Sequence, residues 1–143
     1  MYKKILVALE NSRWDGALLA HIGALAALHR SELLLVHVAD GFAARNYELM
    51  KLAESQEMKD DRTYLEASAA VLRERGLSAV THLALGDPAT GILKTAADEQ
   101  CDLIAMTTHG HRLLADIIYG STINHVRHKA EVPVLLVRGG SAD

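Results

Sequence analysis

Short runs of apolar residues alternate along this chain with longer stretches in which apolar positions recur at helical spacing. The runs lie at residues 5–9, 33–38, 79–85, 103–106 and 132–137, and each is predicted to form a strand. The run at residues 5–9 is continuously apolar, which is typical of a strand buried on both faces. Helices are predicted from about residue 12 to residue 29, over residues 47–75, from residue 88 onward and over residues 121–129, with a loop at residues 41–46. This alternation predicts an α/β fold, in which a parallel sheet is covered by helices on both faces.

Residues with special roles at helix ends mark several of these boundaries. Ser12 is a suitable N-cap for the first helix, and Asp15 follows it at the spacing of a capping box. Gly76 follows the second helix and is suited to end it. Asp87 and Pro88 match the N-cap and first-turn preferences of the third helix. An apolar stripe at positions 18, 22 and 25 is expected to face the sheet.

Length, charge and cysteine content narrow the class of protein. The 143 residues fit one domain, residues 1–143, with a frayed tail at about residues 139–143. The 15 basic and 18 acidic residues give a net charge of -3, which argues against a nucleic-acid-binding protein. No apolar run reaches the roughly 18 residues of a membrane span, and the N-terminal run is too short for a signal peptide. The single cysteine, Cys101, excludes an internal disulfide and is expected to be a buried, inert thiol in a cytoplasmic protein.

Candidate binding residues follow from the predicted sheet, because such sheets bind ligands at the carboxyl ends of strands where the strand order reverses. Glu10 follows the first strand, residues 38–40 the second, and Thr107 onward the fourth. The last connection contains Gly110 and ends in Gly120-Ser121, which is predicted to open the final helix. The free N–H groups of such a helix start bind phosphate. An ordinary helix start without a ligand explains the same residues equally well.

With these features the chain resembles the universal stress protein family over almost its whole length. The matching segments are residues 5–12, the strand Leu35-Val36-His37-Val38, Gly86-Asp87-Pro88-Ala89, residues 102–106 and the strand Pro133-Val134-Leu135-Leu136-Val137-Arg138. The family's nucleotide-binding members resemble the pattern G-x2-G-x9-G-[ST] after the fourth strand. Gly110, Gly120 and Ser121 match its last three positions.

The resemblance implies a five-stranded, Rossmann-like sheet in the order 3-2-1-4-5 and a homodimer that binds ATP, or ADP or AMP, with Mg²⁺. It implies a nucleoside near the ends of the first two strands, with ribose and phosphates at the last connection. The implied binding residues are Ala8, Leu9, Glu10, Val38, Met106, Thr107, His109, Gly110, Gly120, Ser121 and Thr122. The implied dimer uses the last strand, residues 132–138, which begins at Val132 and ends at Arg138. Pro133 also favours an edge position for this strand, and an exposed edge needs covering.

Two residues depart from the family pattern at this site. Thr107 stands where the motif has its first glycine, and Glu10 stands where the family usually has aspartate. Because a β-branched residue resists a positive φ, Thr107 is expected to reshape phosphate binding, while its hydroxyl offers a hydrogen-bond donor. Glu10 keeps the carboxylate but moves it by about a bond length or more.

Other enzyme classes lack their signatures here. The chain has no G-x4-G-K-[ST] P-loop and no G-x-G-x-x-G after the first strand. The tetrapeptide His21-Ile22-Gly23-Ala24 is similar to the HIGH signature of nucleotidylyl transferases, but it lies inside a predicted helix and ends in alanine. A response-regulator receiver domain needs clustered acidic residues near the first strand and a phosphoacceptor aspartate after the third. Only Glu10 is present near the first strand, and Asp87, after the third, is already explained as a helix cap.

The histidines suggest a metal site only weakly. His109 and His111 are close in sequence, and His125 and His128 are three residues apart. No cysteine or carboxylate other than Asp116 joins them at a ligand spacing, which favours a chance grouping.

Three functions are compatible with the sequence. The first is a nucleotide-binding regulator that signals energy or stress state to an unknown protein partner through the connection of residues 107–120. The second is a family member that binds no nucleotide and acts only through protein contacts. The third is a slow ATPase or autokinase, although no nucleophile–base pair is recognisable. Trp14 is expected to pack in the protein rather than stack on adenine.

Overall fold

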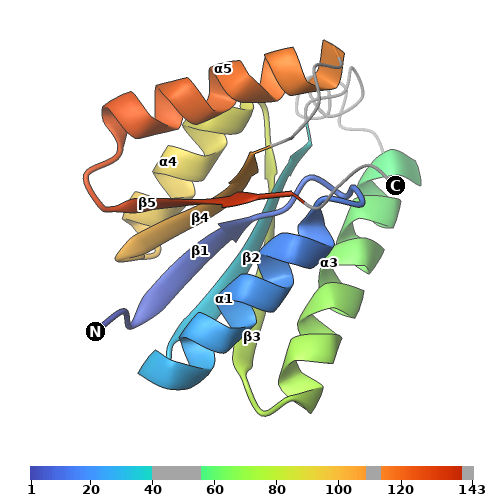
Figure 1. Cartoon of the computed structure of the whole chain (residues 1–143). Helices are drawn as coiled ribbons and strands as arrows, with labels where there is room; N and C mark the ends of the chain where they lie inside the picture. The colour runs from blue at the N-terminus through green and yellow to red at the C-terminus, as the bar shows by residue number, and fades with distance from the viewer. Residues whose placement is uncertain (40–55, 109–113, 140–143) are drawn as a thin grey trace.

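Five parallel strands form the centre of the fold (Figure 1). The computed structural model describes residues 1–39, 56–108 and 114–139. The strands are β1 (Lys4–Ala8), β2 (Glu32–Ala39), β3 (Ser78–Leu85), β4 (Leu103–Thr108) and β5 (Val134–Arg138), and the helices are α1 (Asp15–His29), α3 (Gln56–Glu74), α4 (Pro88–Asp98) and α5 (Leu114–Lys129). The sheet order β3-β2-β1-β4-β5, parallel throughout, confirms the predicted fold and topology.

The helices cover the sheet in two layers, with α1 and α3 on one face and α4 and α5 on the other (Figure 1). The side chains of β1 alternate between these layers. Ile5 and Val7 join the core beneath α1 and α3, whereas Leu6 and Ala8 join the core beneath α4 and α5. Because β1, β2 and β4 are mostly buried on both faces, their sequences are mostly apolar, whereas the edge strand β3 has several exposed positions.

The capping signals of α3 and α4 are confirmed. After α3, Gly76 has a φ of 84° and donates its N–H to the carbonyl of residue 73, while residue 77 donates to the carbonyl of residue 72. This pair of bonds is a Schellman motif, which requires a left-handed residue. At the start of α4, the Asp87 carboxylate accepts the N–H and the hydroxyl of Thr90 at 2.9 and 2.8 Å, and Pro88 takes the first helical position. The Thr90 donors lower the pKa of Asp87.

The first helix begins later than its predicted cap. It starts at Asp15 rather than just after Ser12. The Asp15 carboxylate accepts the Ser12 N–H at 3.3 Å, as the acid of a capping box does. The Ser12 hydroxyl, however, accepts the N–H of Trp14 at 3.3 Å instead of that of Asp15. Trp14 is 6% exposed and lies against Gly139, as expected for a packing residue.

The last helix begins at Leu114, not at Ser121 as predicted. Leu114 and Ala115 are good helix formers, and a glycine inside a helix costs only about 1 kcal/mol relative to alanine. The helix therefore runs through Gly120, and the Gly-Ser pair does not mark its start. The predicted loop at residues 41–46 and the first part of the predicted second helix, residues 47–55, lie outside the described residues.

Strand β5 forms one edge of the sheet, as Pro133 indicated. Pro133 directly precedes the strand, and its carbonyl accepts the Ile104 N–H at 3.0 Å. At the other end, Gly139 is buried and donates its N–H to the Thr108 carbonyl at 2.7 Å, so the frayed tail does not include it. Cys101 is 5% exposed, and burial raises the pKa of its thiol to about 11, as expected for an inert cysteine. No helix in the described part of the chain is long and apolar enough to cross a membrane.

Candidate functional site

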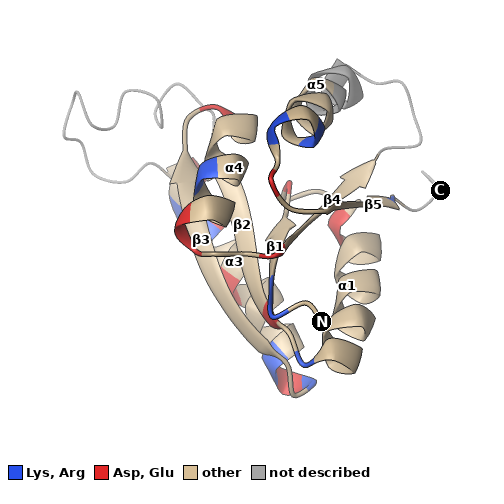
Figure 2. Cartoon of the chain, turned by 90° about the vertical axis from the view of Figure 1, so that its left-hand side faces the viewer, with Lys and Arg blue, Asp and Glu red and all other residues tan. Residues whose placement is uncertain are grey.

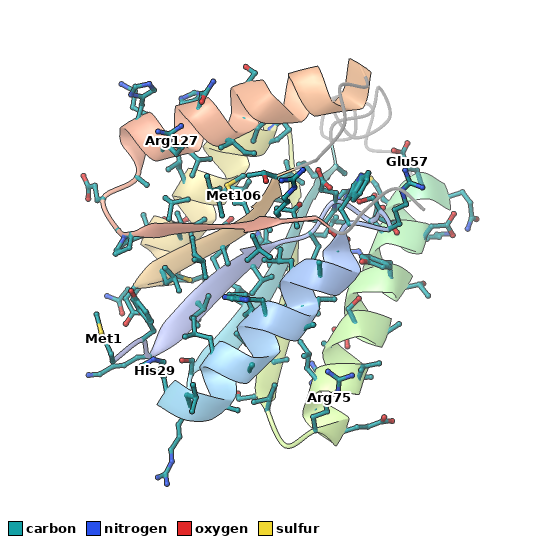
Figure 3. All side chains as sticks on the ribbon, viewed as in Figure 1. Met1, His29, Glu57, Arg75, Met106 and Arg127 are labelled. Carbon is teal, nitrogen blue, oxygen red and sulfur yellow. The ribbon has the colours of Figure 1, made fainter. Side chains whose placement is uncertain are left out.

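A pocket of about 660 Å³ opens at the carboxyl ends of β1 and β2, beside the first turns of α3. Its lining residues are Glu10, Asn11, His37, Val38, Glu57, Asp60 and Asp61. Two residues of the predicted site, Glu10 and Val38, thus come together although they lie on different strand ends. Figure 3 shows the labelled Glu57 at the start of α3, at this edge of the sheet. The pocket has the place that ligand sites occupy in open parallel sheets.

The turn that carries Glu10 is held from behind by Asp15. The Asp15 carboxylate is 1% exposed and accepts the N–H groups of Glu10, Asn11 and Ser12 at 3.0, 2.9 and 3.3 Å. It also accepts the Tyr64 hydroxyl of α3 at 2.5 Å. Burial and the bond to Asp15 raise the pKa of Tyr64 well above its usual range. On the pocket side, the Glu10 carboxylate accepts the Ser12 hydroxyl at 3.1 Å.

A second polar group links α3 to the ends of β1 and β2. Asp61 Oδ1 accepts the Asn11 side-chain amide at 3.1 Å, and Asp61 Oδ2 lies 3.4 Å from His37 Nε2. His37 Nδ1 lies 2.8 Å from the Leu9 carbonyl oxygen. Sequence reasoning missed both Asp61 and His37. The available signal was the position of Asp61 on the buried stripe of α3, together with Met58, where an acidic residue needs a partner.

Other predicted residues at the end of β1 do not line this pocket. Ala8 is 3% exposed and packs beneath α4 and α5. Leu9 is 4% exposed, and its N–H donates to the Val36 carbonyl at 2.8 Å while its own carbonyl faces His37. Their side chains therefore support the strand end rather than the pocket.

Thr107 lies inside β4, where the chain is a regular strand. It pairs with Val137, and it is not among the described residues with positive φ. The expected conflict between a β-branched residue and a left-handed backbone therefore does not arise. Thr107 is fully buried, and its hydroxyl is the one buried side-chain polar atom without a hydrogen-bond partner among the described residues. Met106 is also fully buried and packs on the α4 and α5 side.

The predicted start of the last helix at Ser121 is wrong, so the N–H groups expected to be free there are not. Only the first four N–H groups of a helix have no partner within it. In α5 these belong to residues 114–117, so the N–H groups of Gly120, Ser121 and Thr122 lie in the helix interior. Ser121 is exposed and Thr122 is 8% exposed. His109 and Gly110 lie outside the described residues, so the second position of the motif is not placed.

Charge separates the pocket from the basic end of α5. Four of the seven lining residues are carboxylates, and none of the seven is Lys or Arg. The basic residues of α5 are in its last turn, shown in Figure 2 at the end of the helix remote from its start. Within the described part of the chain, no group of three or more His, Cys, Asp or Glu residues is arranged to hold a metal ion. The pocket is thus suited to hydroxyl and amine groups rather than to anions.

Comparison with known proteins gives the family. The model of the universal stress protein family matches residues 1–138. The chain is 33% identical over 142 residues to a universal stress protein of Thermus aquaticus, covering 96% of this chain and 100% of that protein. It is 29% identical over 155 residues to universal stress protein MJ0577 of Methanocaldococcus jannaschii, covering 96% of each chain.

Solved structures agree in fold. The structure of MJ0577 superposes with a TM-score of 0.77 and 30% identity, and the match covers 99% of each chain. A universal stress protein of Archaeoglobus fulgidus in complex with dAMP gives a TM-score of 0.72 at 20% identity, covering 95% of this chain and 98% of that one. A universal stress protein in complex with cAMP gives 0.71 at 16% identity, covering 97% and 98%. From the family match over residues 1–138 and these relatives, the chain belongs to the universal stress protein family.

Proposed function

We propose that this protein binds an adenine nucleotide at the carboxyl edge of its sheet, with the adenosine in the pocket between Glu10 and Val38. The observation that carries the proposal is the pocket itself, in which these two residues from separate strand ends meet. A volume of about 660 Å³ lies in the range of small-molecule sites. The two fold relatives crystallised with dAMP and cAMP support an adenine nucleotide as the ligand class.

Each end of the nucleoside has a suitable partner in this pocket. The Glu10 carboxylate is an acceptor for the two ribose hydroxyls, and hydrogen bonds to a charged group are worth about 1.5–3 kcal/mol. Val38 is half-buried and offers an apolar surface to the base at the end of β2. Glu10 is already fixed by Asp15 and Ser12, so ribose binding requires little ordering of this turn.

The phosphates are expected to point away from the four carboxylates. Like charges about 5 Å apart near a protein surface repel by roughly 3 kcal/mol. Beyond the pocket along the carboxyl edge of the sheet, α5 follows β4, and the N–H groups without a partner inside α5 belong to residues 114–117. We infer that the phosphate tail runs toward this side, with Mg²⁺ offsetting the charge of ATP or ADP.

Calorimetry with adenosine, AMP, ADP and ATP, with and without Mg²⁺, tests this function. Each ligand should bind, and Glu10→Gln should weaken adenosine and ATP alike by about tenfold, because the ribose loses a charged acceptor. Glu74→Gln, an exposed change at the far end of α3, is the matched control and should bind normally. Absence of heat for all four ligands up to millimolar concentration would end the proposal.

A specific observation favours a second function, in which the protein binds no nucleotide and acts through protein contacts alone. Thr107 replaces the first glycine of the motif and is fully buried, and α5 continues through the Gly-Ser pair. Mass spectrometry of the native protein separates the two functions, because a nucleotide that co-purifies is detected directly. A protein free of nucleotide that also gives no calorimetric heat would favour the second.

A further inference from the structure

His37 and Asp61 face each other on the pocket wall, and both are shielded from solvent. His37 Nε2 lies 3.4 Å from Asp61 Oδ2, and the two side chains are 16% and 7% exposed. The other ring nitrogen, Nδ1, lies 2.8 Å from the Leu9 carbonyl oxygen. Because a carbonyl oxygen only accepts hydrogen bonds, Nδ1 carries the proton of that bond.

The contact at Nε2 therefore depends on a second proton. A neutral imidazole that donates from Nδ1 has a lone pair at Nε2, and here this lone pair faces a carboxylate. Two acceptors cannot form a hydrogen bond, so the contact is attractive only when a proton lies between them. With that proton, His37 and Asp61 form an ion pair that is shielded from most of the solvent.

Asp61 also holds the turn that carries Glu10. Its Oδ1 accepts the Asn11 side-chain amide at 3.1 Å. Asn11 has a left-handed backbone, with a φ of 62°, and directly follows Glu10. One carboxylate thus connects α3, the turn after β1 and, through His37, the end of β2. These three segments are the walls of the pocket.

Other titratable groups face this pair from each neighbouring segment. Glu57 and Asp60 on α3 and Glu10 on the turn after β1 line the same pocket. Behind the turn, Asp15 of α1 accepts the Tyr64 hydroxyl. A test must therefore separate the loss of a shared proton from a change in the total charge of the pocket.

We propose that Asp61 is a positioning residue of the nucleoside site and that a proton shared with His37 sets how firmly it holds the Asn11 turn. With the proton present, α3 and the turn are fixed and Glu10 is held at the pocket. Without it, this wall loosens and adenosine binds more weakly. Only the effect on affinity rests on the proposed nucleotide-binding function, because the shared proton belongs to the ligand-free protein.

The ligand-free protein tests the shared proton. Ring ¹⁵N NMR of histidine and hydrogen exchange of α3 are recorded at about pH 5.5 and about pH 8.5, on either side of the usual imidazole titration range. His37 should keep the Nδ1 proton and lose the Nε2 proton, and the first turns of α3 should lose protection, after correction for intrinsic exchange. In Asp61→Asn the amide nitrogen donates to the bare Nε2 while the amide oxygen still accepts from Asn11, so protection should be independent of pH.

The matched control is Asp60→Asn, which removes the same charge from the same pocket one residue earlier on α3. It should keep the pH dependence of the wild type. Protection that changes with pH equally in wild type and Asp61→Asn, or that stops changing in Asp60→Asn as well, would overturn the proposal.

Adenosine calorimetry tests whether the proton between His37 and Asp61 affects binding at the nucleoside site. Adenosine is the suitable ligand because it has no phosphate whose charge changes over this pH range. From about pH 5.5 to about pH 8.5 the affinity of the wild type for adenosine should fall roughly fivefold or more, which is a typical size for coupling between two sites. The affinity of Asp61→Asn should fall by less than about twofold. Binding with the same pH profile in both proteins would refute the positioning role and leave the proposed function intact. If adenosine, AMP and ATP all fail to bind at either pH, the proposed function fails. The NMR and hydrogen-exchange results then still show whether His37 and Asp61 share a proton.

Discussion

The Asp15 carboxylate holds the candidate site in place without lining the pocket. It is almost inaccessible to solvent, and its bonds go to the backbone of residues 10–12 and to the Tyr64 hydroxyl. A buried carboxylate is tolerated because its oxygens accept several hydrogen bonds. The position of Glu10 is therefore determined by a residue behind the turn.

Asp15→Asn should destabilise the protein by about 2–4 kcal/mol, because an amide nitrogen then faces N–H donors and leaves buried groups unpaired. Urea unfolding measures the change. Asp98→Asn, which breaks only the exposed pair with Lys94 on α4, is the control and should change stability by less than about 0.5 kcal/mol. Equal effects of the two changes would contradict the account of Asp15.

The buried thiol of Cys101 predicts a loss of stability at alkaline pH. Burial raises its pKa from 9.0 to about 11, so the folded state disfavours the thiolate. A raised pKa contributes stability that is complete below about pH 9 and is lost as the pH rises toward 11. Between these values, wild type should lose about 2–3 kcal/mol more than Cys101→Ala in urea unfolding. Parallel losses in both proteins would show that other groups account for the decline.

The residues that sequence reasoning placed in the pocket are those on strand ends. Glu10 and Val38 were found because the carboxyl ends of parallel strands meet at one edge of the sheet. Asp61 and His37 were missed because their significance depends on a contact between α3 and β2, which no local pattern records.

Among the elements, α5 departs most from its predicted form. A Gly-Ser pair after a long connection is typical of a helix start, but Leu114 and its neighbours extend the helix toward the N-terminus. Strands and caps were easier to predict because their signals are local, such as the Asp87-Pro88 cap or the apolar run of β1. A helix can continue through glycine, so the Gly-Ser signal was ambiguous.

Ser121→Pro tests the extent of α5. In a helix that begins at residue 114, proline at position 121 removes an internal hydrogen bond and clashes with the preceding turn, which costs about 3 kcal/mol or more. Ala115→Pro, in the first turn, should be tolerated. Thermal unfolding of both variants measures the difference, and a Ser121→Pro protein as stable as wild type would place the helix start near residue 121.

Two glycines near helix ends should respond to alanine with opposite signs. Gly76→Ala forces a side chain onto a φ of 84° and should destabilise the end of α3 by about 1 kcal/mol. Gly16→Ala lies in the first turn of α1 with open space around it, and should stabilise by up to about 1 kcal/mol. Urea unfolding of the two variants measures the change in the free energy of unfolding. A Gly76→Ala protein more stable than wild type would contradict the left-handed backbone conformation of this residue.

At the scale of the whole molecule, β5 presents an open strand edge, which homodimer formation would cover. Gly139 donates inward to Thr108 of β4, so the N–H of Arg138 points outward by the alternation of a parallel ladder. If two copies pair along this edge, Arg138→Pro should shift sedimentation equilibrium toward monomer by roughly tenfold or more. An unchanged dimer would place the interface elsewhere, and a monomeric wild type at all concentrations would refute the dimer.

The whole molecule also determines how a nucleotide lies across the sheet. Four carboxylates gather at the ends of β1 and β2, while the helix start whose N–H groups have no partner inside the helix, that of α5, follows β4. This asymmetry favours the nucleoside on one side of the point where the strand order reverses and the phosphates on the other.

The most direct measurement is a crystal structure of the protein grown with ATP and Mg²⁺. The account predicts electron density for adenosine between Glu10 and Val38, with the phosphates turned away from Asp60 and Asp61 toward β4 and the first turn of α5. Density that places the phosphates among these carboxylates, or an adenosine bound away from the ends of β1 and β2, would contradict it.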